Sequence, residues 1–195
     1  MAKKAWILLA NGFEEIEAMT PADVLRRAGV EVTLVGVGGQ LLTGAHGIAV
    51  QVDAVLDAPH LADFVAGKTV VDALILPGGG PGADNLAASE MVPALIRHQA
   101  DAGRLTAAIC ASPAVVLARA ANVLNGRQAT CFPGCEKFFS KNTVFKSDRV
   151  VRDGNILTSR SPGTAMEFSL ELVRILVGDE MVSRLMAQML VVLPP

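Results

Sequence analysis

A cysteine stands at the point where the segment RLTAAICASPAVVLARA, residues 104–120, changes its pattern. The residues up to Cys110 form an apolar run typical of a strand, and an alanine-rich helical pattern follows from Ser112. With Ser112 as N-cap and Pro113 in the first helical position, the thiol would lie near the positive end of a helix dipole, which favours the thiolate. A sharp turn between strand and helix also exposes a nucleophile at its apex. The alternative is that Cys110 is a small buried apolar residue at a strand end.

Three carboxylates follow the first apolar run of the chain, in NGFEEIEAM. At helical spacing Glu14 and Glu17 share a face and Glu15 points away, so one carboxyl group can face a cleft. Glu17 is the candidate partner of the cysteine. Opposite a thiolate in a poorly hydrated site its pKa would rise, and the protonated carboxyl would donate a hydrogen bond to sulfur. The alternative is that all three are solvated charges at a helix N-terminus, which accounts for Glu14 and Glu15.

Two glycine-rich segments are candidates for the binding part of a catalytic site. The segment PGGGPG, 77–82, lacks the Lys-Ser/Thr ending of a phosphate loop. It is either a tight turn or a strand end whose backbone N–H groups point into a cleft and hold a developing oxyanion. The segment VGVGG, 35–39, follows the second expected strand and opens no helix, which argues against a dinucleotide fingerprint.

The remaining histidines and cysteines indicate neither a metal site nor a hydrolytic Cys–His pair. None of His46, His60 and His98 follows a strand directly. Cys131 and Cys135 lack the spacing and the histidine company of a zinc site, so they are expected to pack, with a redox role as the alternative. An odd number of cysteines in a chain of this size favours reduced thiols and a cytoplasmic location.

The elements that would position these groups alternate in type. Continuous apolar runs alternate with helical segments as βαβ units, which is typical of a parallel sheet buried between two layers of helices. Two segments, 39–53 and 150–158, have hairpin character. Ligands bind at the carboxyl ends of the strands in such a fold, so the three loops that follow the first, third and fourth runs should meet there. We expect strands at 5–10, 30–37, 72–76 and 105–110, helices at 15–29, 91–103, 112–122 and 163–178, and site loops at 11–17, 77–82 and 110–113.

Length and composition favour one domain over residues 1–195, since no linker divides the chain. Hydrophobic residues make up 51% of the chain and its mean hydropathy is +0.43, which is more apolar than a monomer needs. A buried interface in a homo-oligomer would account for this excess. The net charge of −2, without a long basic block, argues against nucleic-acid binding. No segment has the length of a membrane span, and the apolar run at the N-terminus is expected to be a strand rather than a signal peptide.

Four separated blocks, EEIEAMTPADVLRRAG, LILPGGGPGADNL, AAICASPAVVLA and LTSRSPGTAMEF, closely resemble the ThiJ/PfpI superfamily, in the branch of the human parkinsonism-associated protein and bacterial YajL. The resemblance spans essentially the whole chain. It implies an α/β, flavodoxin-like three-layer sandwich with a mostly parallel central sheet, a nucleophile elbow and a homodimer. The reactive cysteine of the family corresponds to Cys110 and its cleft glutamate to Glu17. The oxyanion-binding amides correspond to Gly79 and Ala111.

The chain departs from the human branch at two positions. Phe132 stands where that branch has a histidine before the proline, as in bacterial members, which argues against a protease mechanism. His46 replaces an arginine that helps to hold anions near the dimer seam, whereas Arg27 is retained. We therefore expect Arg27, His46, Phe132 and Pro162 as pocket residues, with anion affinity in question.

The resemblance implies cofactor-independent chemistry on reactive dicarbonyls such as methylglyoxal, or on their glycated adducts, of glyoxalase or deglycase type. Cys110 would attack the carbonyl, Glu17 would move protons, and the product would be a hydroxy acid. The alternative is a redox-responsive protective protein or chaperone, because peroxide oxidises the same kind of thiolate. One thiolate serves both functions, so the sequence leaves both open.

Overall fold

A seven-stranded sheet forms the centre of the computed structural model, which describes residues 2–192. Its strand order is β10-β11-β7-β6-β1-β2-β5, and every neighbouring pair is parallel except β10 with β11. Ile7 in β1 lies opposite Leu34 of β2 on one side and Ile75 of β6 on the other. The strands are β1 (Lys4–Leu9), β2 (Glu31–Gly36), β5 (Ala54–Val55), β6 (Ala73–Leu76), β7 (Leu105–Ile109), β10 (Val150–Asp153) and β11 (Ile156–Ser159).

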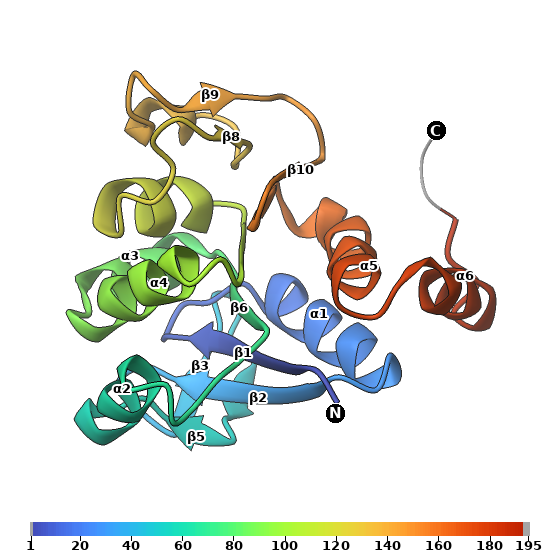
Figure 1. The fold of residues 1–195 in the computed structure, drawn as a ribbon, viewed down its shortest axis with the longest axis horizontal. Helices are drawn as coiled ribbons and strands as arrows, with labels where there is room; N and C mark the ends of the chain where they lie inside the picture. Colours follow the sequence, from blue (N-terminus) through green and yellow to red (C-terminus); the bar gives the residue numbers. More distant parts are fainter. Residues whose placement is uncertain (1, 193–195) are drawn as a thin grey trace.

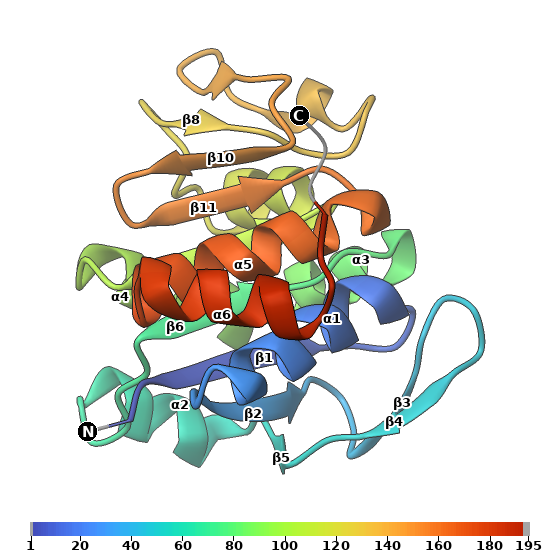
Figure 2. The same ribbon diagram turned by 90° about the vertical axis from the view of Figure 1, so that its right-hand side faces the viewer.

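Helices cover both faces of this sheet, which makes the fold a three-layer α/β sandwich (Figures 1 and 2). Alternate residues of β1 point to opposite layers, because side chains alternate along a strand. Ile7 and Leu9 pack with the first layer, and Trp6 and Leu8 pack with the second. The first layer holds α1 (Glu15–Arg27), α5 (Ala165–Leu176) and α6 (Asp179–Gln188); the second holds α2 (Ala58–Val65), α3 (Gly80–Ala88), α4 (Met91–Asp101) and η1 (Pro113–Ala120).

Two small sheets lie outside the sandwich, the second of them alongside β10 (Figure 2). One is the antiparallel hairpin of β3 (Leu41–Thr43) and β4 (Ala49–Gln51). The other pairs β8 (Gln128–Ala129) with β9 (Val144–Phe145) in parallel, and the short helix η2 (Glu136–Phe138) lies in the segment that joins them.

The sequence correctly predicted the parallel strands β1, β2, β6 and β7, both hairpins and the helices α1, α4 and α5, and it missed β5. Gly29 and Gly178, expected to end two helices, have φ angles of 79° and 119°, which a side chain would strain. The sequence missed α3, because its first turn lies in a glycine- and proline-rich segment that locally indicates a turn. Tertiary contacts stabilise that turn, where the Gly82 N–H donates to the Gly12 carbonyl at 3.0 Å. Helix α6 was missed as well.

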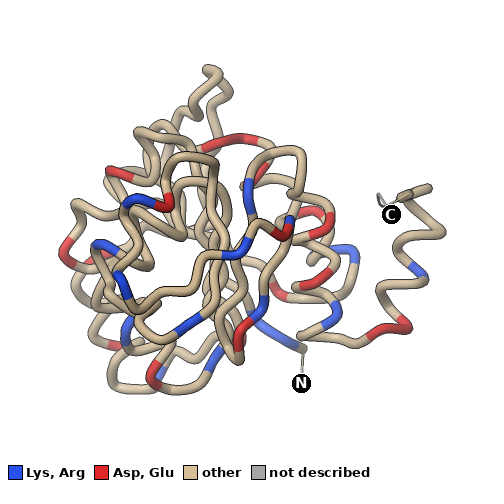
Figure 3. The backbone as a smooth tube through the Cα atoms, turned by 90° about the horizontal axis from the view of Figure 1, so that it is seen from above, with Lys and Arg blue, Asp and Glu red and all other residues tan. Residues whose placement is uncertain are grey.

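Basic and acidic residues are interspersed along the chain (Figure 3). Within residues 2–192, every helix is too short or too polar to cross a membrane.

Candidate active site

Three loops meet at the carboxyl ends of β1, β6 and β7, as predicted. The Glu14 N–H donates to the Gly78 carbonyl at 3.0 Å, which joins the first loop to the second. The hydroxyl of Ser112 donates to the Pro77 carbonyl at 2.6 Å, which joins the third loop to the second. These bonds bring together segments that are distant in sequence, so one small volume contains the predicted carboxylates, glycines and cysteine.

Cys110 forms the elbow between β7 and η1. Its φ angle is +67°, in the left-handed region that non-glycine residues rarely adopt, and such strain is characteristic of functional sites. Two backbone bonds hold it there: the Cys110 N–H donates to the Ser159 carbonyl at 3.0 Å, and the Phe132 N–H donates to the Cys110 carbonyl at 2.8 Å. The turn is therefore fixed from two neighbouring segments.

The helix after the elbow begins as predicted, with Ser112 as N-cap and Pro113 in the first position. Its winding differs from the expected α-helix. The Ala121 N–H donates to the Val116 carbonyl five residues earlier, at 2.8 Å, so η1 is a π-helix, a conformation that is frequent at functional sites. The Ser112 side chain does not cap it, because its hydroxyl bonds to Pro77.

Glu17 lies beside the cysteine and is fully buried, with 0% of its surface exposed. Its Oε2 accepts a hydrogen bond from the Gly78 N–H at 2.8 Å, and the carboxyl group also hydrogen-bonds to Cys110. The other oxygen, Oε1, is buried without a hydrogen-bond partner among residues 2–192. Burial raises the pKa of Glu17 from 4.5 to about 7. The sequence expectation of a cleft carboxyl with a raised pKa agrees with this geometry.

The thiol itself differs from the sequence prediction. Burial raises the pKa of Cys110, and the charge of Glu17 and its hydrogen bond raise it further. The prediction of an acidic thiol, made from the helix dipole, is therefore wrong, because burial outweighs the dipole. Both contributions from Glu17 to this rise require its carboxylate form. The two groups thus titrate as a pair, and the state with one proton on Glu17 and a negative charge on sulfur is the nucleophilic one.

Two backbone amides face the sulfur. The N–H groups of Gly79 and Ala111 hydrogen-bond to Cys110 and lower the pKa of its thiol, against the effect of burial. Gly79 has a φ angle of +85°, and a Cβ there would lie 2.2 Å from the Gly12 carbonyl oxygen, so only glycine fits. The structure brings together Cys110, Glu17, Gly79 and Ala111, as expected from the sequence.

Glu14 and Glu15 are buried, so their interpretation as solvated charges is wrong. Glu15 points away from the cysteine, as its helical spacing predicts, and accepts bonds from the His46 N–H at 2.8 Å and the His46 Nδ1 at 2.9 Å. Although burial raises the pKa of Glu15, hydrogen bonds from His46 and from backbone N–H groups lower it to about 2.

His46 in turn lies 3.5 Å from Glu14, and its hydrogen bond to Glu15 raises the pKa of the imidazole. Ligand atoms of these three residues lie within 4.8 Å of one another, a spacing that could hold a metal ion. The raised pKa favours the protonated imidazole, whose positive charge would face these two carboxylates. The contact also fixes the β3–β4 hairpin to the start of α1.

The other predicted pocket residues separate into two groups. Phe132 is 43% exposed and adjoins the elbow through its N–H, and Pro162 begins the short helix η3 (Pro162–Thr164), directly after β11. Arg27 is not brought to the cysteine of its own chain. It lies ten residues after Glu17 on α1, about 15 Å along the axis, and pairs with Asp23 at 2.7 Å.

The other two cysteines are free thiols, like Cys110. Cys131 is fully buried, and burial raises its pKa to about 12, in agreement with a packing role. Cys135 is half-buried, and burial also raises the pKa of its thiol.

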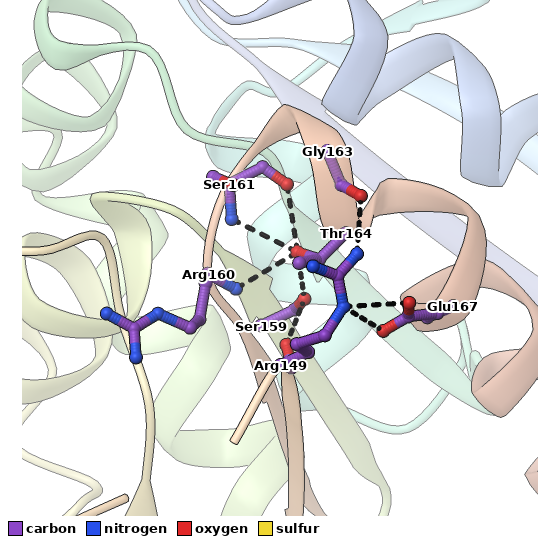
Figure 4. A network of polar contacts seen from close by, with 7 residues as sticks. All are labelled: Arg149, Ser159, Arg160, Ser161, Gly163, Thr164 and Glu167. Atoms are coloured by element: carbon purple, nitrogen blue, oxygen red, sulfur yellow. Dashed lines mark hydrogen bonds and ion pairs between the residues drawn. The ribbon is translucent and has the colours of Figure 1, made fainter. Parts of the chain in front are cut away.

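A polar network holds the loop after β11, next to the elbow (Figure 4). The Thr164 hydroxyl accepts bonds from the N–H groups of Arg160 at 3.2 Å and Ser161 at 3.1 Å, and it lies 2.6 Å from the Ser159 hydroxyl. Arg149 donates to both carboxylate oxygens of Glu167 at 2.8 Å, which fixes the far side of the loop. This network therefore supports the Ser159 carbonyl that binds the strained Cys110 amide.

Sequence reasoning missed the contribution of Gly78. A Cβ at this position would lie 2.6 Å from the Cys110 Cβ and 2.7 Å from the Glu17 Oε2, so its glycine permits the contact between the two. The signal was present in PGGGPG, but three adjacent glycines look alike in sequence. The support from Ser159 carried no local signal at all.

Comparison with known proteins agrees with this architecture. The family model described as "DJ-1/PfpI family" matches residues 3–175. Protein dj-1beta of Drosophila melanogaster is 38% identical over 193 residues, which cover 98% of either chain. The crystal structure of Drosophila melanogaster DJ-1beta superposes with a TM-score of 0.89 at 36% identity, covering 99% of this chain and all of that one.

A further relative carries an activity in its name. Glutathione-independent glyoxalase DJR-1.2 of Caenorhabditis elegans is 34% identical over 186 residues, which cover 94% of each chain. The extent of the matches, together with the elbow cysteine, shows that this chain belongs to the DJ-1/PfpI family.

Proposed function

We propose that the protein is a cofactor-independent, cysteine-dependent enzyme that converts reactive dicarbonyls such as methylglyoxal, or their glycated adducts, to hydroxy acids. The observation that supports this proposal most is the buried contact between Glu17 and Cys110, with two backbone amides directed at the same sulfur. A nucleophile, a neutral proton donor and an oxyanion site are the groups that this reaction requires. The name of the Caenorhabditis elegans glyoxalase supports the assignment.

The first step forms a bond between sulfur and carbon. The Cys110 thiolate attacks the aldehyde carbon of methylglyoxal, and the oxygen that gains the electron pair is held by the N–H groups of Gly79 and Ala111. Protonation of that oxygen by Glu17 gives a hemithioacetal. The ionised Glu17 is then a base beside the former aldehyde C–H.

The second step moves a proton between carbons. Glu17 removes the C–H proton to give an enediol and returns it to the neighbouring carbon, while the hydroxyl proton passes from the former aldehyde oxygen to the former ketone oxygen. The former ketone thus becomes an alcohol and the former aldehyde becomes a thioester. Water then cleaves the thioester to lactic acid and restores the thiol. The sum is methylglyoxal plus water to lactic acid, and therefore no external oxidant, reductant or cofactor is consumed.

The test is to incubate the purified protein with methylglyoxal and to quantify lactate, with Cys110→Ser as the control. We expect lactate to form at a rate proportional to the enzyme, and the variant to produce none above the uncatalysed background. Equal lactate formation by the variant would refute the proposal, as would rapid loss of methylglyoxal without any hydroxy acid.

A second candidate, a redox-responsive protein, rests on the unpartnered Oε1 atom of Glu17. Two equivalents of peroxide would oxidise the Cys110 thiolate through the sulfenate to the sulfinate, with one water released at each step. A protonated Glu17 would then donate a hydrogen bond to a sulfinate oxygen. Mass spectrometry after peroxide treatment should show a gain of two oxygen atoms at Cys110, lost in Cys110→Ala.

We further propose that the protein is a homodimer in a reducing cytoplasm. Two isoleucines support a buried interface: Ile16 and Ile48 are 54% and 58% exposed, and with Glu14, Glu15 and His46 they line a hollow of about 240 Å³ beside the site. Large apolar side chains grouped on a surface favour association. The free thiols fit a reducing compartment.

A further inference from the structure

The turn of the β3–β4 hairpin brings His46 to two carboxylates at the start of α1 (Figure 2). The Nδ1 atom of its imidazole lies 2.9 Å from the Glu15 Oε2 and 3.5 Å from the Glu14 Oε2. In a tetrahedral zinc site, with bonds of about 2.0–2.2 Å, neighbouring ligand atoms lie about 3.3–3.6 Å apart. The two distances from the imidazole are close to this spacing, and the ligand atoms of all three residues lie within 4.8 Å of one another.

The carboxylate of Glu15 is oriented by the backbone of the hairpin. Its Oε1 atom accepts hydrogen bonds from the N–H groups of His46 at 2.8 Å and Ile48 at 3.4 Å. Because these bonds occupy one carboxylate oxygen, the other, Oε2, is left facing the imidazole. A ligand group that is already held in place loses less conformational entropy when it binds an ion, so this carboxylate is preorganised for coordination.

The carboxylate of Glu14 is buried without a hydrogen bond. Glu14 has only 9% of its surface exposed, and its side chain does not cap the helix that it precedes. Among residues 2–192, its only cationic neighbour is His46, at 3.5 Å. Together with Glu15 and His46, it lines the hollow of about 240 Å³ beside the active site. Because a buried carboxylate is costly unless a close partner compensates it, this position favours a directly bound cation.

The charges of the group favour a divalent cation over a proton. The carboxylates of Glu14 and Glu15 carry two negative charges, and no lysine or arginine among the described residues lies within ion-pair distance of them. A protonated His46 compensates one of these charges, whereas a divalent ion bound to the neutral imidazole compensates both. One imidazole with two carboxylates is a ligand set that suits Zn²⁺ and similar transition metals.

We propose that Glu14, Glu15 and His46 bind a divalent transition-metal ion of the class of Zn²⁺. Three protein ligands leave a fourth position open, and the adjoining hollow has room for water or another small ligand there. The ion links the β3–β4 hairpin to the start of α1, and catalysis as proposed above uses none of these three side chains. The sequence pattern gave no indication of this site, because His46 reaches it through a hairpin turn rather than from a strand of the central sheet.

The test is to treat the purified protein with a chelator, remove the chelator and titrate the protein with Zn²⁺ by isothermal titration calorimetry. We expect wild type to bind one Zn²⁺ per chain at this site. His46→Gln and Glu14→Gln should each raise the dissociation constant by at least about 100-fold, because each variant removes a ligand. The side chain of His46 is mostly exposed, so its replacement leaves the core intact.

Two further variants show where the ion binds. His60→Gln is the matched control, because His60 also places its Nδ1 on a carboxylate, 2.5 Å from the Asp57 Oδ1, but has no second carboxylate within ion-pair distance among the described residues. Cys110→Ser removes the thiol of the active site, which is itself a zinc ligand by type. Both variants should bind Zn²⁺ as wild type does.

Three results would overturn the inference: absence of Zn²⁺ binding by wild type, unchanged binding in His46→Gln or Glu14→Gln, and loss of binding in Cys110→Ser. The last result would place the ion on the thiol of the active site. None of these measurements depends on dicarbonyl turnover. Absence of methylglyoxal turnover would therefore refute the proposed function alone.

Discussion

The carboxyl group of Glu17 and the thiol of Cys110 contact each other across Gly78, a residue whose N–H binds the carboxylate and whose Cα leaves no space for a side chain. The contact joins the first turn of α1 to the elbow after β7. Both groups are largely removed from water, so the protonation state of each depends on that of the other. Most of the expected behaviour of the protein follows from this pair.

Replacement of Glu17 by glutamine should abolish proton transfer and preserve the thiol. The amide retains the shape and a hydrogen-bond donor, but it cannot exchange the proton that the rearrangement requires. We expect dicarbonyl turnover to fall by about 10²- to 10⁴-fold, as general acid–base catalysis contributes, and Cys110 alkylation by iodoacetamide to change far less.

Glu31→Gln is a suitable control for that variant, because Glu31 is an exposed carboxylate at the start of β2, at the opposite end of the strands. Glu15 is unsuitable, since it anchors the β3–β4 hairpin. Full turnover in Glu17→Gln would show that another group transfers the proton.

Turnover should depend on pH through the pair. With both protons bound the sulfur is neutral. Loss of the first proton gives the one-proton states of the pair, and the nucleophilic one has its proton on Glu17 and its charge on sulfur. We expect kcat/KM to rise with pH to a plateau, with a midpoint at or below the pKa of about 7 for Glu17. The thiolate absorbance of wild type minus Cys110→Ala should stay low over this range, because burial raises the pKa of the Cys110 thiol. Turnover that stays constant between pH 5 and 8 would contradict the mechanism.

The raised pKa of Glu17 also predicts a loss of stability as the pH rises. Below pH 4.5 the group is protonated in both the folded and the unfolded state. Between pH 4.5 and about 7 the unfolded state ionises first, so the free energy of unfolding decreases by up to about 3 kcal/mol. Urea titrations from pH 4 to 8 should show this decrease in wild type relative to Glu17→Gln. Parallel curves for the two proteins would mean that Glu17 is not protonated in the folded state.

Gly78→Ala should distort the elbow. The added Cβ would lie 2.6 Å from the Cys110 Cβ and 3.1 Å from its sulfur, so the thiol must move away from Glu17. We expect a destabilisation of about 1–3 kcal/mol and a loss of turnover of at least about 100-fold. Gly80→Ala, in the same loop, is the control, since its Cβ meets nothing within 4 Å. The steric argument fails if the two variants turn over at equal rates.

The homodimer can be tested by dilution. A buried interface of apolar residues should keep the protein at about twice 20.3 kDa in light scattering over a wide concentration range. A monodisperse monomer would contradict the proposal and leave the exposure of Ile16 and Ile48 unexplained.

The sequence by itself determined the order of the elements and the position of the nucleophile. Strand and helix periodicity, the glycines that end α1 and α5, and the Ser112-Pro113 helix start are local features, each set by backbone sterics within a few residues. The carboxylates of NGFEEIEAM indicated Glu17 as the partner of Cys110, and the family blocks added Gly79 and Ala111. All four residues lie together in the structure.

Only the tertiary structure decided what surrounds these residues. The bond from Gly78 to Glu17 joins residues 61 positions apart, and the burial that raises both pKa values comes from loops distant in sequence. The helix dipole is local and was predicted from the sequence. Desolvation outweighs it and has no local signature, because it depends on every segment that excludes water. For the same reason, the burial of Glu15 against His46 could be recognised only after the chain had been folded.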